Sequence, residues 1–102
     1  MPLYTFILDY EGGTCIAQVK SRSLKSAPLL WATTLEEGEV FTYKHGAKCK
    51  AELIEAVKNN TPVVLNGLQN AWCMSARIQN KFALINFVLT VETKKTRKTR
   101  TV

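Results

Sequence analysis

The feature of this sequence that most constrains its fold is a pair of alternating segments near the start of the chain. Residues 3–9 and 14–20 alternate in polarity and are rich in β-branched and aromatic side chains. Gly12-Gly13 lies between them, and glycine readily adopts the positive φ angles of a tight hairpin turn. The pattern therefore predicts an antiparallel β-hairpin.

A second pair of such segments lies near the other end of the chain. Residues 71–78 and 82–91 flank Gln79-Asn80, and asparagine tolerates positive φ, so a second hairpin is predicted. The last segment is apolar on both of its faces. It is therefore expected either to be central, with its second face under loops, or to pair through that face with another copy. The candidate residues for such a homodimer are Ile85, Phe87 and Leu89.

Between the hairpins, two stretches carry apolar residues at helical spacing. Ser23 or Ser26 is expected to cap the first helix, which ends near Glu37-Gly38. The second helix is expected over 48–59, before Pro62. A short extended segment over 39–44 and another near 62–65 are also compatible with the pattern. The order ββααββ predicts an α+β fold with two layers, in which the two hairpins form one antiparallel sheet with both helices on one face.

The charge of the chain is concentrated at its end. The chain has 102 residues and a net charge of +6, and we expect a single domain over 1–92 followed by a basic, disordered tail over 93–102. The basic residues of that tail are Lys94, Lys95, Arg97, Lys98 and Arg100. They are candidates for weak, salt-dependent contact with nucleic acid or an acidic protein. The alternative is a solvated tail that keeps the domain soluble.

The residues capable of reactive chemistry are few and scattered. The three cysteines are widely spaced and the chain has one histidine, so neither a metal site nor a disulfide framework is indicated, and no cofactor is expected. Free cysteines and the lack of a signal peptide or membrane-length apolar run favour a cytoplasmic protein without membrane contact. His45, Cys73 and Arg77 are the candidates for a pocket, should the chain be a small enzyme or ligand-binding domain.

Residues 4–37, YTFILDYEGGTCIAQVKSRSLKSAPLLWATTLEE, resemble the ββα opening of HicB-like antitoxin domains. The resemblance lies in a hairpin with a glycine turn, followed by a serine-containing loop and a helix with internal alanines. It implies an antitoxin-like or nucleic-acid-associated module. The Pro-Gly-Cys stretch typical of that family is absent, so no functional residue is carried over. The whole chain also resembles small uncharacterised bacterial proteins.

These observations favour a non-enzymatic interaction module that associates with a second copy of itself. The first alternative is an antitoxin-like or nucleic-acid-associated module that uses the basic tail. The second is the small enzyme or ligand-binding domain. A sizeable pocket with convergent polar groups would favour this last reading, whereas a closed core with a flat apolar sheet face would favour the interaction module.

Overall fold

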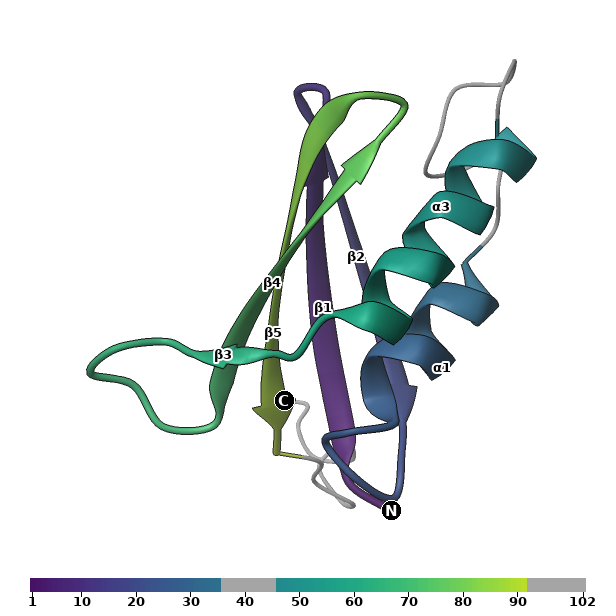
Figure 1. Cartoon of the computed structure of the whole chain (residues 1–102). Helices are drawn as coiled ribbons and strands as arrows, with labels where there is room; N and C mark the ends of the chain where they lie inside the picture. The colour runs from purple at the N-terminus through teal and green to yellow at the C-terminus, as the bar shows by residue number, and fades with distance from the viewer. Residues whose placement is uncertain (36–45, 92–102) are drawn as a thin grey trace, which may run out of the picture.

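A computed structural model describes residues 1–35 and 46–91 of the chain. The described part is an α+β fold in which a five-stranded antiparallel sheet is covered by two helices (Figure 1). The elements in chain order are β1 (Leu3–Tyr10), β2 (Gly13–Lys20), α1 (Ala27–Thr34), α3 (Gly46–Asn59), β3 (Val63–Val64), β4 (Ala71–Ile78) and β5 (Lys81–Thr90).

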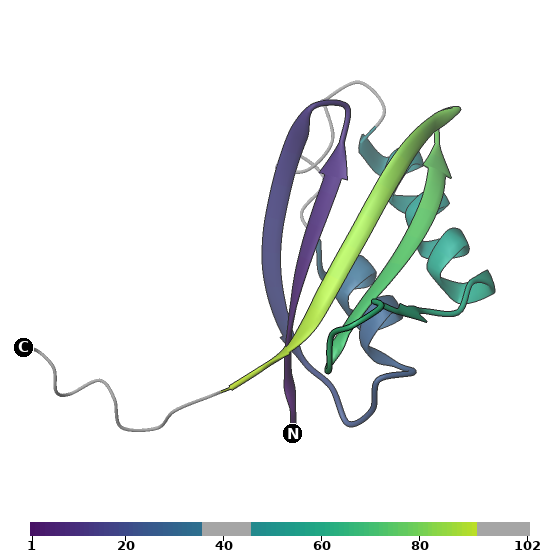
Figure 2. The same ribbon diagram turned by 90° about the vertical axis from the view of Figure 1, so that its left-hand side faces the viewer.

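The two predicted hairpins are confirmed, and they join into one sheet. The strand order is β2-β1-β5-β4-β3, so β1 pairs with β5 and the start of β1 lies beside the end of β5 (Figure 2). Phe6 lies opposite Phe87 in this pairing. The sheet differs from the predicted two-hairpin layout by one short strand, β3, which pairs with β4. β5 is central, which confirms half of one alternative, but its second face is not covered by loops among the described residues, because Phe82 and Val88 on that face are exposed.

The turn of the first hairpin lies one residue earlier than predicted. Tyr10 pairs with Gly13, so Glu11 and Gly12 are the two turn residues, with φ angles of 52° and 80°. Positive φ at both positions defines the turn whose twist matches that of the flanking strands. The second hairpin turns in the same way at Gln79-Asn80, with φ angles of 51° and 66°.

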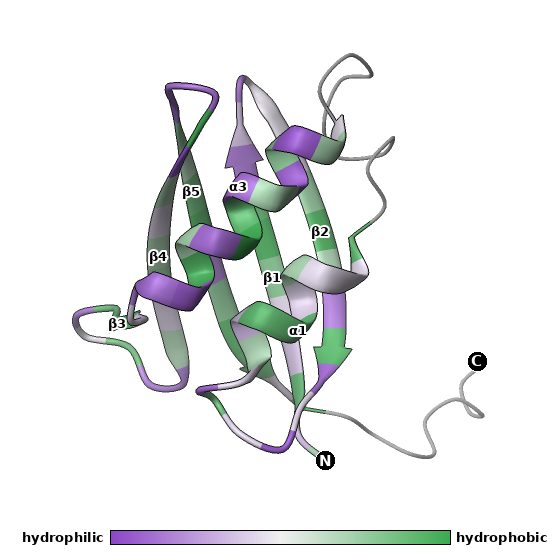
Figure 3. Cartoon of the chain, turned by 45° about the vertical axis from the view of Figure 1, so that its right-hand side comes forward, coloured by the Kyte–Doolittle hydropathy of each residue, from purple (hydrophilic) through white to green (hydrophobic). Residues whose placement is uncertain are grey.

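Both helices pack on the same face of the sheet (Figure 3). α1 is shorter than predicted in the described residues, and α3 begins at Gly46, two residues before the expected start. The predicted end of the first helix near Glu37-Gly38 and the extended segment over 39–44 lie outside the described residues. The apolar stripe of α3 is confirmed, because Cys49, Leu53 and Val57 are all buried.

Aromatic rings join the two layers of the core. Trp31 of α1 stacks on Phe6 of β1, Phe6 stacks on Phe87 of β5, and Phe87 stacks on Trp72 of β4. Stacked pairs contribute beyond the area that they bury. The rings thereby tie α1 to the three central strands.

The placement of the candidate self-association residues needs correction. Ile85 and Phe87 are completely buried, because both point toward the helices from the central strand. Leu89 lies on the same face near the end of β5 and is 38% exposed. The residues of β5 on the uncovered face are instead Phe82, Leu84, Asn86 and Val88, since alternate residues of a strand point to opposite faces.

Candidate interaction surface

The uncovered face of the sheet, called the outer face here, carries several apolar side chains. Ile16 is 65% exposed and Phe82 is 67% exposed, whereas Val88 is 36% exposed. Ile7 lies directly opposite Ile16 on the neighbouring strand. Because directly opposed residues of paired strands share a face, these two isoleucines form an apolar pair that reaches the edge of the sheet at β2.

Polar side chains on the outer face bind one another. The Gln18 side-chain amide donates to Thr5 Oγ1 over 2.9 Å, and the Thr14 hydroxyl donates to Asp9 Oδ1 over 2.7 Å. The hydroxyls of Thr5 and Thr90 also share a hydrogen bond. These bonds connect neighbouring strands, so they hold the polar side chains in place around the apolar pair.

One edge of the sheet is largely covered. β3 pairs with β4 at Cys73 and Trp72. The backbone N–H of Leu65 then donates to the carbonyl of Ala71, and the side chain of Asn60 donates to the carbonyl of Ser75. Unpaired backbone groups at an edge are a template for pairing with another strand, and such coverings remove that template.

The other edge is formed by β2. Within the part of the chain that the structure describes, no strand pairs with the outer edge of β2. This strand has eight residues, contains no proline or bulge, and carries a charge only at its final residue, Lys20. Proline, bulges and charges are the usual means by which proteins protect an edge strand. β2 lacks all of them from Gly13 to Val19.

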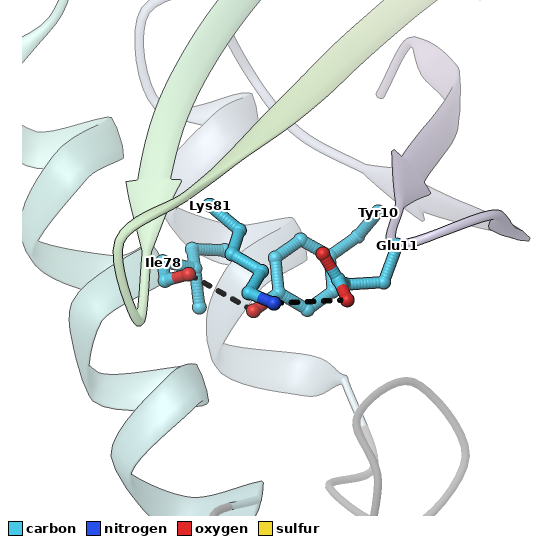
Figure 4. A network of polar contacts seen from close by, with 4 residues as sticks. All are labelled: Tyr10, Glu11, Ile78 and Lys81. Carbon is cyan, nitrogen blue, oxygen red and sulfur yellow. Dashed lines mark hydrogen bonds and ion pairs between the residues drawn. The ribbon is translucent and has the colours of Figure 1, made fainter.

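The turn ends of the two hairpins are tied together (Figure 4). The Tyr10 hydroxyl donates to the carbonyl of Ile78 over 2.9 Å, and the Lys81 ammonium lies 3.5 Å from the Glu11 carboxylate. The ion pair is about half exposed on each side, so its contribution to stability is small. The Tyr10 bond fixes the first hairpin on the second.

The carboxylate of Glu52, on α3, lies next to the turn of the second hairpin. The Glu52 carboxylate accepts hydrogen bonds from the backbone and side-chain N–H groups of Gln79. Burial, and then the negative charge of Glu52, raise the pKa of the Cys49 thiol. A thiol with a raised pKa is a poor nucleophile at neutral pH. The bonds from Gln79 to Glu52 therefore anchor the second turn on α3, and the Cys49 thiol on the same helix is not activated as a nucleophile.

A hollow of about 790 Å³ lies between the loop that precedes α1 and the end of α3. Its lining includes Lys25 and Lys58 and contains no acidic residue. Ser23 and Ser26 also line it, and their hydroxyls bind each other over 2.9 Å. The apolar residues of the lining are Leu24, Pro28, Leu29, Val57 and Pro62. Such a lining suits an anionic group carried on an apolar body.

The predicted pocket residues do not meet. Cys73 and Arg77 lie on the outer face of β4, because their opposed partners are Asn86 and Phe82. The hollow lies among the helices on the opposite side of the sheet. His45 and the five basic residues of the tail lie outside the described residues. The pocket around His45, Cys73 and Arg77 is thus not assembled by the residues that the structure places.

The edge of β2 is the feature that sequence reasoning missed. Thr14, Ile16 and Gln18 were assigned to a strand, but the strand order that leaves them at an edge depends on the pairing of β1 with β5. The only available signal was the lack of proline and charge over 14–19.

Comparisons with protein-family models, curated proteins and solved structures find no match to the chain. The resemblance of residues 4–37 to the opening of HicB-like domains therefore stays a prediction. None of the described helices is long and apolar enough to cross a membrane. Within 1–35 and 46–91, no group of three or more His, Cys, Asp or Glu side chains is placed to hold a metal ion.

Proposed function

We propose that this chain is a non-enzymatic interaction module that associates with a second copy of itself through its sheet. The observation that carries the proposal is the uncovered outer face, whose apolar pair of Ile7 and Ile16 extends to the edge of the sheet. The side chain of Ile16, 65% exposed on an edge strand, is stabilised by a partner that removes its apolar surface from water.

Charge favours a second copy as that partner. The first hairpin has an acidic end, with Asp9 and Glu11, and a basic end, with Lys20 and Arg22. Two copies of β2 placed side by side in opposite directions bring the acidic end of each next to the basic end of the other. Complementary charges of this kind steer association and fix its direction.

The dispersal of reactive side chains supports a function in binding. Cys49 is buried with a raised pKa, and Cys73 and Arg77 lie on the outer face, away from the hollow. Nucleophilic catalysis requires a nucleophile and a base within hydrogen-bond reach. The described residues do not provide such a pair around any of these three side chains.

The test is sedimentation of the full chain over a range of concentrations. The wild-type chain is expected to form dimers. Ile16→Lys is expected to raise the dissociation constant of the dimer at least about tenfold, because it places one lysine from each copy, two like charges, at the contact. Val63→Lys is the matched control, since Val63 is also 65% exposed but lies on β3 at the other edge. A wild-type chain that sediments only as an 11.5 kDa species at every concentration would overturn the proposal.

The hollow favours a second candidate function, the binding of a small ligand with an apolar body and an anionic group. The support is the presence of Lys25 and Lys58 in a lining that is otherwise largely apolar and contains no acidic residue. The fluorescent probe 8-anilinonaphthalene-1-sulfonate has this chemistry. The native chain is expected to bind it, and the double substitution Lys25→Ala and Lys58→Ala is expected to weaken binding, whereas Lys48→Ala is not. Equal binding by all three proteins would exclude this site.

A further inference from the structure

We propose that two copies of the chain pair edge to edge through β2, in opposite directions, with Ile16 facing the partner's Ile16 across the two-fold axis. The two sheets then become one continuous sheet. This inference rests on the proposed self-association, to which it adds the surface and the register. The alternative geometry is a dimer in which the outer faces stack on each other.

The first step is the direction of the backbone groups of β2. In a hairpin closed by a two-residue turn, the residues that flank the turn exchange both hydrogen bonds, and every second residue repeats the pattern. Tyr10 and Gly13 flank the turn, so residues 13, 15, 17 and 19 bind β1. The bond from the Ser21 N–H to the Pro2 carbonyl, at 3.0 Å, continues this series. Thr14, Ile16 and Gln18 therefore direct their N–H and C=O groups away from β1.

The second step is the contrast between the two edges. The carbonyls of Ala71 and Ser75, on β4, accept hydrogen bonds from Leu65 and Asn60. Among the described residues, no strand pairs with Thr14, Ile16 and Gln18 on the side of β2 that faces away from β1. Backbone groups are obligatory hydrogen-bonding groups, and an added strand satisfies an entire row of them at once. A strand of a second copy can therefore pair with the unpaired backbone groups of β2.

The third step is the register. A two-fold axis at Ile16 places Thr14 opposite the partner's Gln18, so Thr14, Ile16 and Gln18 of each strand face outward-directed residues of the other. A shift by one residue would set these groups opposite residues 15 and 17, whose groups already bind β1. An axis at Ala17 would also set outward-directed residues opposite one another, but it would place Ile16 opposite the partner's Gln18. The axis at Ile16 instead sets the two exposed isoleucines opposite each other, and this apolar match selects the register.

The fourth step is the side-chain row that this register creates. Ile7 and Ile16 are paired on the outer face, so the axis at Ile16 joins two such pairs into a row of four isoleucines. Neighbouring β-branched residues across strands stabilise a sheet. The row covers one side of Ile16, which is otherwise 65% exposed, and accounts for an apolar residue at an open edge.

Amide hydrogen exchange on the unmodified chain tests the proposal residue by residue. Exchange is measured by NMR below and above the dimer dissociation constant obtained from sedimentation. The amides of Thr14, Ile16 and Gln18 are expected to exchange at least about tenfold more slowly in the dimer. The amides of Ala17 and Val19, which bind β1, are expected to be protected in both states.

The outcomes separate this inference from the proposed function. A chain that is monomeric at every concentration overturns both. A dimer in which Thr14, Ile16 and Gln18 exchange as fast as in the monomer overturns the edge pairing and leaves the self-association standing.

A pair of substitutions at one position gives a second test. Gln18→Pro removes an N–H group that faces the partner, whereas Gln18→Thr keeps it, and both remove the 2.9 Å bond from the Gln18 side chain to Thr5. Proline is tolerated at an edge position whose N–H does not serve the ladder of the monomer. The dissociation constant of the dimer is expected to be at least about tenfold higher for Gln18→Pro than for Gln18→Thr. Equal constants for two folded variants would refute the pairing.

Discussion

Trp31 of α1 and Phe6 of β1 stack face to face, with ring centroids 4.7 Å apart and planes only 6° from parallel. Both side chains are completely buried. Phe6 continues the stack to Phe87, at 4.4 Å. The contact of one helix with two central strands thus depends on three consecutive rings. The Trp31 Nε1 group is also buried, without a hydrogen-bond partner among the described residues, so this indole serves packing.

Substitution of Trp31 is expected to reveal this role. Trp31→Ala should lower the free energy of unfolding by about 3–5 kcal/mol, because it removes a buried ring and leaves a cavity. Trp31→Phe should cost less, since it keeps a stacking ring and removes an unpartnered N–H group. Urea denaturation followed by circular dichroism measures both changes. A cost below about 1 kcal/mol for Trp31→Ala would contradict the stacking account.

The hydroxyl of Tyr10 gives the fold a dependence on alkaline pH. Burial, followed by the negative charges near the ring, raises the pKa of Tyr10 above its ordinary value of 10.0. Because the folded state holds this proton more tightly than the unfolded state does, the stabilisation is fully present below pH 10 and is lost as the pH rises through the raised pKa. Ionisation also removes the donor to the Ile78 carbonyl.

Tyr10→Phe is the comparison that isolates this effect. The wild-type chain is expected to be more stable than Tyr10→Phe at pH 8, and the difference is expected to shrink above pH 10. Chemical denaturation of both proteins at several pH values measures it. Burial also raises the pKa of Cys49, so both proteins are expected to lose some stability at alkaline pH from this thiol as well, and Cys49→Ala in both backgrounds removes that contribution. A difference that grows with pH would show that the sign is wrong.

The first turn contains a residue in an unfavourable conformation. Glu11 has φ of 52°, a region in which most side chains crowd the backbone and asparagine does so least. Glu11→Asn should raise the free energy of unfolding by about 1 kcal/mol, because it creates the Asn-Gly pair that this turn prefers. The loss of the exposed ion pair with Lys81 offsets little of this gain. Thermal denaturation checks the prediction, and a lower melting temperature would contradict it.

The basic tail is expected to be the main contact with nucleic acid, if the chain binds any. Filter binding of duplex DNA across salt concentrations should give a log–log slope of roughly −4 to −4.5 for five neutralised phosphates. A chain that lacks 93–102 should lose this binding, whereas a chain with the three exposed cations Lys20, Arg22 and Lys25 changed to alanine should lose less. Retention by the truncated chain at low salt would assign the contact to the folded domain.

Local patterns predicted much of this fold. The alternation over 3–9 and 14–20, and the residues around Gln79-Asn80, were enough to place both hairpins, because strand geometry and turn geometry depend on residues that are neighbours in sequence. The spacing of Cys49, Leu53 and Val57 predicted the buried face of α3 for the same reason. The first turn was predicted at Gly12-Gly13, one residue too late. In the structure Gly13 pairs with Tyr10 and belongs to β2, so the turn residues with positive φ are Glu11 and Gly12.

The sequence by itself determined which segments are strands and helices, and that β5 is apolar on both faces. Only the tertiary structure decided which of those faces is covered. The pairing of β1 with β5 makes Ile85 and Phe87 interior residues and leaves Ile16 at an open edge. Strand order depends on contacts between residues far apart in the chain, and a pattern of period two is the same for a central strand and an edge strand. The interaction surface is therefore a property of the assembled sheet.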